Sequence, residues 1–241
     1  LSTWSETTEN NTARDQLISG AGTQTSTMIM PGYIAETSTA DLTSVEEWDG
    51  SSWTEVSELN NGRYVGASFS PASGVGSAMN YIGGGSSHGD KHESWNGSGW
   101  TEIAEINTAR IEMGRAGTST AALIAGGEDA SDPSSDTVES WNGSAWTEVA
   151  EVNTGRRSSG SSGTQTSAMV YGSIAATYMA NCETWDGTSW TEVGDLGTAR
   201  GTGASSGIGT GNNSTAWYAA GRTSDPAAAS TATEEWSFSH A

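Results

Sequence analysis

The stretch "ESWNGSAWTEVAEVNTGR", Glu139–Arg156, recurs in nearly the same wording along this chain of 241 residues. The further copies, one of them divided between the two chain ends, are Glu46–Arg63, Glu93–Arg110, Glu183–Arg200, and Glu234–Trp236 together with Trp4–Arg14. In every copy the closing arginine stands ten residues after the second tryptophan, whereas successive copies lie 44 to 49 residues apart. A unit of constant length is therefore repeated, with segments of variable length between its copies. This pattern indicates a solenoid, a propeller or an array.

Each repeat contains four strand-like runs. A small-residue run follows the arginine, as in Arg110–Gly117, and a more apolar run that ends in glycine comes next, as in Thr120–Gly127. The third run is "TVESW", and the fourth, "WTEVAEV", alternates with a period of two, as a half-buried strand does. An Asn-Gly or Asp-Gly pair separates these two runs and is a strong hairpin signal. Trp141 and Trp146 are therefore predicted to face each other across the turn.

Four antiparallel strands in each of five copies predict an all-β fold, a five-bladed β-propeller that occupies residues 1–241 as one domain. The divided copy favours a closed ring. Residues 200–236 would give three strands of the last blade, and residues 1–10, around Trp4, would complete it, so that the N- and C-terminal strands share one blade. Closure of this kind leaves no exposed sheet edge. An open solenoid is the alternative, but it gives no reason for the two ends to complement each other.

Composition limits the classes of partner. The formal net charge is −20 and Lys91 is the single lysine. Such a polyanion repels phosphates and anionic membranes, so neither nucleic acid binding nor membrane insertion is expected. One cysteine, Cys182, excludes an internal disulfide and a cysteine-cluster metal site. Ten of the 11 tryptophans belong to the repeat. Burial of a large side chain contributes roughly 1.5–3 kcal/mol, so these tryptophans are predicted to build the core.

The repeat resembles a kelch repeat. It has a double glycine after the second run, Glu-x-aromatic in the third, Trp in the fourth and a closing Arg; the matching residues are Gly126, Gly127, Glu139, Trp141, Trp146 and Arg156. The resemblance covers the whole chain but is not complete, because Trp replaces the usual Tyr and the double glycine is intact in two copies. Five blades would also be fewer than the six or seven usual in that family. The Thr-, Ser- and Gly-rich sequence is further similar to the sequences of kelch-like propellers in virion proteins of marine bacteriophages.

The kelch resemblance implies a position for the closing arginines. In kelch propellers the segment after the fourth strand lies on the same face as the loop between the second and third strands. The residues that would then surround one mouth of the axis are Arg14, Arg63, Arg110, Arg156 and Arg200. Five guanidiniums could bind a ligand that carries carboxylates. Alternatively, each could pair with a glutamate of the third or fourth strand, and this structural interpretation is the favoured one because ten such glutamates are available.

The loops between the second and third strands are predicted to carry specificity, because they differ in length and chemistry while the strands repeat. Their ranges are Pro31–Thr43, Gly84–His92, Gly127–Thr137, Gly172–Asn181 and Gly221–Thr233. Candidate ligand-binding residues in them are His88 and Asp90, beside His92, then Asp129 and Asp132, near Asp136, and the aromatic residues Tyr33 and Tyr178, together with Trp217 on a strand. The histidines and aspartates lack a recognised metal-ligand spacing, and the aromatic side chains could equally pack in the core. No metal or cofactor is predicted.

The predicted function is that of a non-enzymatic structural or recognition module, in a phage virion or another extracellular assembly. Its expected partners are other virion or assembly proteins and a host surface glycan, which it would bind through the variable loops. The alternative is a secreted carbohydrate-active enzyme or lectin, which would require one blade to break the symmetry with converging acids or a metal. An intracellular adaptor, a third hypothesis, would need partner domains that this sequence does not contain.

Overall fold

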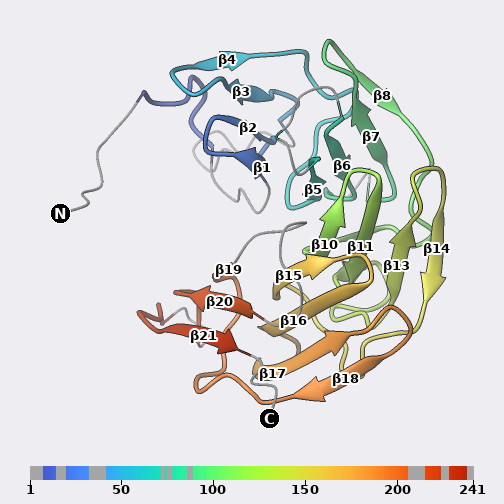
Figure 1. The fold of residues 1–241 in the computed structure, drawn as a ribbon, viewed down its shortest axis with the longest axis vertical. Coiled ribbons are helices and arrows are strands. Elements are labelled where there is room, and N and C mark those ends of the chain that lie inside the picture. Colours follow the sequence, from blue (N-terminus) through green and yellow to red (C-terminus); the bar gives the residue numbers. More distant parts are fainter. Residues whose placement is uncertain are drawn as a thin grey trace.

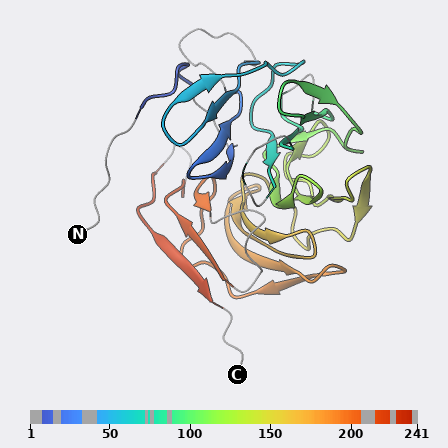
Figure 2. The same cartoon turned by 45° about the horizontal axis from the view of Figure 1, so that its top comes forward.

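The computed structural model describes residues 8–14, 20–32, 42–71, 74, 78–85, 89–205, 215–223 and 228–237. Within these residues the regular structure is β-strand, and all strand pairs are antiparallel. The sheets are arranged around a common centre, which makes the fold an all-β propeller (Figures 1 and 2).

Four sheets have four strands each and are called blades 1 to 4. Blade 1 contains β1 (Gly20–Thr23), β2 (Ser26–Ile29), β3 (Glu46–Trp48) and β4 (Trp53–Glu55). Blade 2 contains β5 (Ala67–Phe69), β6 (Asn80–Ile82), β7 (His92–Trp95) and β8 (Trp100–Glu102). Blade 3 contains β10 (Gly114–Thr118), β11 (Ala121–Ala125), β13 (Val138–Trp141) and β14 (Trp146–Val149). Blade 4 contains β15 (Gly160–Thr164), β16 (Ser167–Ile174), β17 (Tyr178–Trp185) and β18 (Trp190–Val193).

Two smaller sheets complete the description. The C-terminal sheet contains β19 (Ala204–Ser205), β20 (Thr215–Ala219) and β21 (Thr233–Ser237). A two-stranded ribbon pairs β9 (Arg110–Ile111) with β12 (Glu128–Asp129). The first strand of each sheet lies towards the centre of the molecule, and β4, β8, β14 and β18 lie at its rim (Figure 1).

The prediction of five four-stranded blades is wrong, because the residues that the structure describes form four such blades and a C-terminal sheet of three strands. In the intact copies an Asp-Gly or Asn-Gly turn leads from the third strand directly into the fourth, whereas the fourth strand of the last blade was predicted from a distant segment, residues 1–10. The fourth strand predicted around Trp4 lies outside the described residues. Residues 8–14, which are described, contain no strand.

The hairpin between the third and fourth strands has the predicted register. Trp141 is the direct partner of Trp146, with ring centroids 5.4 Å apart. At the turn, Asn142 Oδ1 accepts hydrogen bonds from the backbone N–H groups of Ser144 and Ala145, both at 2.9 Å. Gly143 has a φ of 94°, which side chains rarely adopt. The same geometry recurs in blades 1, 2 and 4, so turn chemistry fixes the tryptophan pairs.

Gly143→Ala is expected to lower the free energy of unfolding by roughly 1–2 kcal/mol, because alanine is strained at positive φ. Urea denaturation would measure the change. The matched control is Gly99→Ala in the equivalent hairpin of blade 2, where an added Cβ would meet nothing within 4 Å and φ is not positive. A control variant destabilised as much as Gly143→Ala would contradict this explanation.

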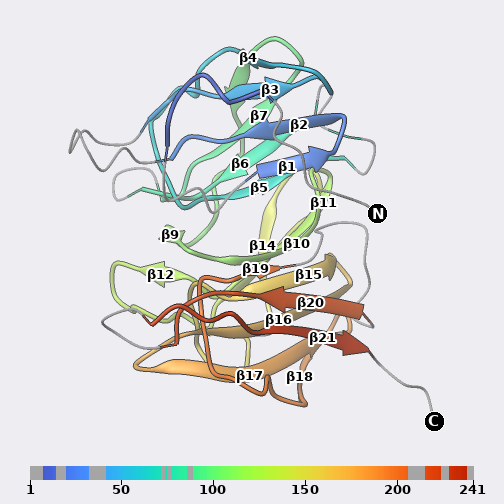
Figure 3. The ribbon, with the colours of Figure 1, turned by 90° about the vertical axis from the view of Figure 1, so that its left-hand side faces the viewer.

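The core is divided into clusters that lie between neighbouring sheets. The cluster between blades 3 and 4, for example, joins Leu123 and Val138 of blade 3 to Val170 and the pair Trp185 and Trp190 of blade 4. The tryptophan pairs of blades 2, 3 and 4 each pack against the preceding blade in this way, as the prediction that tryptophans build the core requires, whereas Trp48 and Trp53 of blade 1 are half-buried. Figure 3 shows the molecule from the side, with β9 and β12 at its left end. We call this end the loop face, because the described parts of the connections between second and third strands lie there.

Candidate functional site

The closing arginines lie beneath the loop face. The Arg110 N–H donates to the Gly89 carbonyl of blade 2, and the Arg156 N–H donates to the Ser135 carbonyl of blade 3, each at 3.1 Å. Arg63 and Arg200 make the corresponding bonds to Leu42 and Met179, at 3.2 and 3.1 Å. The backbones of Arg63, Arg110 and Arg156 thus pair with the connection between the second and third strands of the preceding sheet, and that of Arg200 pairs with the start of β17.

The side chain of each arginine enters the following sheet and forms an ion pair there. The pairs are Arg14–Glu46, Arg63–Glu93, Arg110–Glu139, Arg156–Glu183 and Arg200–Glu234. All five guanidinium side chains are fully buried. The ion pairs of the structural interpretation are therefore present, and in every case the partner is the third-strand glutamate.

The arginine is one of several donors that surround each carboxylate. In blade 4, Glu183 Oε2 accepts both the backbone N–H and the side-chain amide of Asn153, each at 2.8 Å. Glu183 Oε1 accepts the Thr154 N–H at 3.2 Å as well as Arg156 Nη2. The Asn153 amide also donates to the Trp190 carbonyl, 3.3 Å away on the fourth strand. The motif Asn-Thr-x-Arg is thus explained, because Asn153, Thr154 and Arg156 all donate hydrogen bonds to the glutamate of the next blade.

Burial, charge and hydrogen bonding act together on the pKa values of Arg156 and Glu46 in these clusters. Burial lowers the pKa of Arg156, and the nearby Glu183 opposes this effect. Burial alone would raise the pKa of Glu46, but hydrogen bonds from Asn11 and Thr12, with the charge of Arg14, hold it below its ordinary value. A carboxylate that accepts several N–H bonds is stabilised in its charged form. The repeated charges are thus used within the scaffold, where a ligand would have to displace an existing partner.

The C-terminal sheet departs from this pattern. Gly197 occupies the position of the asparagine, so its N–H donates to Glu234 Oε2 at 2.6 Å but no side-chain amide accompanies it. The Glu234 side chain is 30% exposed, whereas the other four glutamates are at most 1% exposed. A Cβ on Gly197 would approach Glu234 Oε2 to 3.3 Å, and this exposed carboxylate can shift to receive it.

Gly197→Asn is expected to raise the free energy of unfolding by about 1 kcal/mol, because it adds a hydrogen bond to a charged group and restricts the unfolded chain. Urea denaturation would measure the gain. Gly197→Ala is the matched control, since it restricts the unfolded chain equally but supplies no amide. Equal stability of the Asn and Ala variants would show that the amide adds nothing.

The aspartates predicted as ligand-binding residues are bound within their own loops. Asp129 Oδ1 accepts the N–H and the hydroxyl of Ser131 at 2.7 Å and the Asp132 N–H at 2.8 Å. Burial would raise the pKa of Asp129, but the bonds from Ser131 and Asp132 lower it. Asp132 Oδ1 accepts the Ser134 N–H at 2.8 Å. Asp90 is half-buried, and its carbonyl accepts the Ile106 N–H at 3.0 Å.

Of the predicted histidine cluster, His92 is turned into the core. His92 is the first residue of β7 and its side chain is fully buried between blades 2 and 3, in contact with Trp141 and Trp146. It therefore points into the core instead of towards a ligand. His88 and Tyr33 lie outside the described residues. Across the residues that the structure describes, no group of three or more His, Cys, Asp or Glu side chains could hold a metal ion.

The predicted loop Gly172–Asn181 is mostly strand. β16 runs to Ile174 and β17 begins at Tyr178, which pairs with Ile174, so the connection is a short turn. It was predicted as a loop because it separates the second and third runs of the repeat, but Gly172 (φ 55°) lies at a register shift between Tyr171 and Ser173, beyond which pairing resumes. Blade 4 therefore has an extended hairpin on the loop face, and the half-buried Tyr178 lies on it.

Three hydrogen bonds between neighbouring sheets, which the sequence did not reveal, form part of a ring around the axis at the loop face. The residue two positions after the repeat arginine has positive φ in the four copies where it is described: Val65 (52°), Glu112 (57°), Ser158 (51°) and Thr202 (57°). Each of the last three donates its N–H to the carbonyl of the one before it, at 2.9 to 3.1 Å. We call these four residues the mouth ring. Strained backbone of this kind persists where the surrounding structure enforces it.

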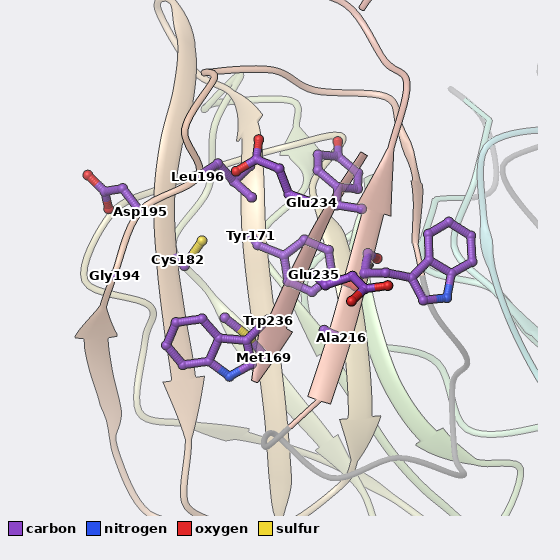
Figure 4. Close-up of a pocket in the computed structure, with 12 residues that line it drawn as sticks. Met169, Tyr171, Cys182, Gly194, Asp195, Leu196, Ala216, Glu234, Glu235 and Trp236 are labelled. Carbon is purple, nitrogen blue, oxygen red and sulfur yellow. Dashed lines mark hydrogen bonds between the residues drawn. The ribbon is translucent and has the colours of Figure 1, made fainter. Parts of the chain in front are cut away.

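A small cavity lies between blade 4 and the C-terminal sheet (Figure 4). It has a volume of about 60 Å³, and Tyr171, Cys182, Leu196 and Trp236 contribute to its lining, with Glu235 also beside it. A volume of this size holds water molecules but not a sugar ring. Trp217 also borders the cavity and is the large apolar residue most exposed in the described chain, at 43%.

Comparisons with known proteins identify the fold. No family model and no curated protein matches the sequence. Among solved structures, that of YjhT, a propeller, superposes with a TM-score of 0.72 over 89% of this chain and 79% of the YjhT chain, at 14% sequence identity. In the described residues there is no helix long and apolar enough to cross a membrane. This chain is thus similar in fold to YjhT, and at such low identity the likeness extends to the propeller architecture alone.

Proposed function

We propose that this protein is a non-enzymatic recognition and structural module that binds a protein or a glycan through its loop face. One observation carries the proposal: the polar residues that repeat are used within the scaffold, whereas the connections between second and third strands differ from blade to blade. Arg156 and Asn153, for example, are used to bind Glu183. Residues that build the scaffold are expected to be the same in every blade, whereas residues that recognise a partner are expected to differ between blades.

The blade-to-blade differences on the loop face are structural as well as chemical. In blade 3 the connection folds back as β12 and pairs with β9, and Glu128 forms an ion pair with Arg157. In blade 4 the same connection is the extended hairpin that carries Tyr178. Rigid elements that present dissimilar segments on one face are a common basis for recognition.

We further propose that the repeat is of the kelch type and that the assembly is extracellular, with a phage virion as its first candidate. The support is the kelch pattern of glycines, glutamate, tryptophans and arginine, and the Thr-, Ser- and Gly-rich wording similar to that of virion propellers. The net charge of −20 suits a protein that stays soluble at high concentration on the outside of an assembly.

A glycan array combined with copurification from the source assembly would test this function. Tyr178→Ala and Asp132→Ala alter the loop face, and both are expected to weaken binding about tenfold or more if their segments contact the partner. Thr166→Ala, on the exposed turn between β15 and β16 at the opposite face, is the matched control and should bind normally. Loss of binding in the control alone, or no ligand and no partner in either assay, would contradict the proposal.

A further inference from the structure

The C-terminal sheet ends at one edge of β21. Its strand order is β19-β20-β21, so among the described strands β21 pairs with β20 alone. Glu234 on β21 corresponds to Glu46 on β3 of blade 1, and β3 has a fourth strand on its other side. Trp236 is half-buried, whereas the first tryptophans of blades 2, 3 and 4 are at most 3% exposed. β21 thus forms an edge at a position that lies inside the sheet in the four blades.

The backbone groups on this edge follow from the register of blade 1. On β3 and its ends, every second residue bonds to the fourth strand, from the Val45 carbonyl to the Asp49 N–H. The equivalent residues along β21 are Thr233, Glu235 and Ser237. In the described part of the chain, no hydrogen bond uses their outward groups. A strand edge of this kind readily accepts a further strand.

The cavity beside β21 is suited to a tryptophan on the added strand. In blade 4 the Trp190 Nε1–H donates to the Ala150 carbonyl of blade 3 at 3.1 Å, and blade 2 has an equivalent bond. Ala150 stands four residues after the second tryptophan of its blade, and Gly194 holds that position in blade 4. Gly194 lines the cavity (Figure 4), and its carbonyl accepts no hydrogen bond among the described contacts. A tryptophan opposite Trp236 would lie over the cavity and could donate to this carbonyl.

The charge at this edge is negative. Glu235 is exposed on β21, and Asp195 and Glu234 also line the cavity. Arg200, the arginine that reaches this sheet, is bound to Glu234. A strand that pairs here is therefore expected to carry a lysine or an arginine opposite Glu235. Two copies of this chain, each with a net charge of −20, would bring two acidic strands together, so a second copy is not the expected occupant.

We propose that β21 and the cavity beside it form a docking site for an extended segment of a partner protein. The segment contains a tryptophan, which lies opposite Trp236, and directly after it a lysine or an arginine, which lies opposite Glu235, in the antiparallel order found in blade 4. In strand addition the main-chain hydrogen bonds supply affinity and the side chains supply specificity. The site is separate from the loop-face connections, so it does not depend on the recognition proposed above.

The test is fluorescence anisotropy with a dye-labelled peptide and the full chain at low ionic strength. The probe, GTSWKEVG, has the sequence of residues 187–194 with lysine in place of Thr191. Saturable binding is expected, and alanine in place of the tryptophan of the peptide should weaken it about tenfold or more. Glutamate in place of the lysine should weaken it about threefold, because a like charge would then face Glu235.

Two variants of the chain separate charge from backbone pairing. Glu235→Lys should reverse the preference, so that the glutamate peptide binds more tightly than the lysine peptide. Glu235→Pro removes an N–H group that points away from β20, which an edge strand tolerates, and should weaken binding of both peptides about tenfold or more. If Glu235→Pro unfolds, Glu235→Lys still decides the matter, because its side chain is exposed.

Glu192→Lys is the matched control, because Glu192 is exposed on the outer strand of blade 4 and its substitution changes the net charge equally. This control should bind the lysine peptide as the wild type does. Wild-type protein that does not bind that peptide, or equal losses in Glu192→Lys and Glu235→Lys, would overturn the proposal. Self-association of the chain that the peptide displaces would identify a second copy as the occupant, and would also overturn it.

Discussion

Glu183→Gln is expected to lower the free energy of unfolding by about 3–5 kcal/mol, the usual effect of removing one partner from a buried ion pair. The four groups that approach the carboxylate oxygens are all donors: the Asn153 N–H and amide, the Thr154 N–H and Arg156 Nη2. A glutamine places a further donor, its NH₂ group, against two of them. The fully buried Arg156 guanidinium also loses its counter-charge.

Glu192→Gln is the matched control for this prediction. Glu192 is the direct cross-strand partner of Glu183, but it is exposed on the outer strand of the blade. Its substitution should change the free energy of unfolding by less than about 0.5 kcal/mol. Urea denaturation of the two variants would decide the matter. If both lost the same stability, the effect would come from general charge and not from the buried network.

His92→Val is expected to make the protein less sensitive to acid. His92 is fully buried, and its Nδ1 accepts the Trp146 Nε1–H bond at 3.1 Å, which requires the neutral ring. Burial lowers its pKa to about 3, with a smaller contribution from Arg63, although a bond to Ala104 opposes the shift. The unfolded chain takes up this proton near pH 6.5, so falling pH favours unfolding from that point down to the folded pKa.

At pH 5 this linkage costs the wild type about 2 kcal/mol relative to pH 7, and His92→Val should remove that loss. Valine already occupies the equivalent position in blades 1 and 3, as Val45 and Val138, so it fits the interface. Urea denaturation at several pH values between 7 and 5 would measure the difference between the two proteins. Parallel curves for the wild type and the variant would contradict the assignment of the acid sensitivity to His92.

Much of the blade structure was predictable because it depends on local chemistry. The Asn142-Gly143 turn sets the register, and from it the contact between Trp141 and Trp146 follows. The sequence could not indicate which glutamate pairs with Arg110, since Glu139 and Glu148 face each other across the same hairpin. The choice depends on burial, because Glu139 is enclosed beneath the loop face and Glu148 lies at the rim.

The predictions were wrong where contacts between distant segments determine the structure. The number of four-stranded blades depends on pairing between distant segments, which no local signal encodes. The segment Gly172–Asn181 was predicted as a loop from its place between the second and third runs of the repeat, but it extends a hairpin because β16 and β17 already hold it in register. His92 lies close to His88 in the sequence, yet its place in the alternation of β7 turns it inward.

The pairing of each arginine with the next sheet has a consequence for how such a protein can grow. One copy of the phrase, from its glutamate to its arginine, carries an acceptor for the neighbour before it and a donor set for the neighbour after it. Duplication of the gene segment that encodes this phrase would therefore supply, at once, the glutamate and the arginine that bind the two neighbouring sheets. An added copy could form these ion pairs with its neighbours without further mutation, which offers a physical explanation for copies that remain so alike.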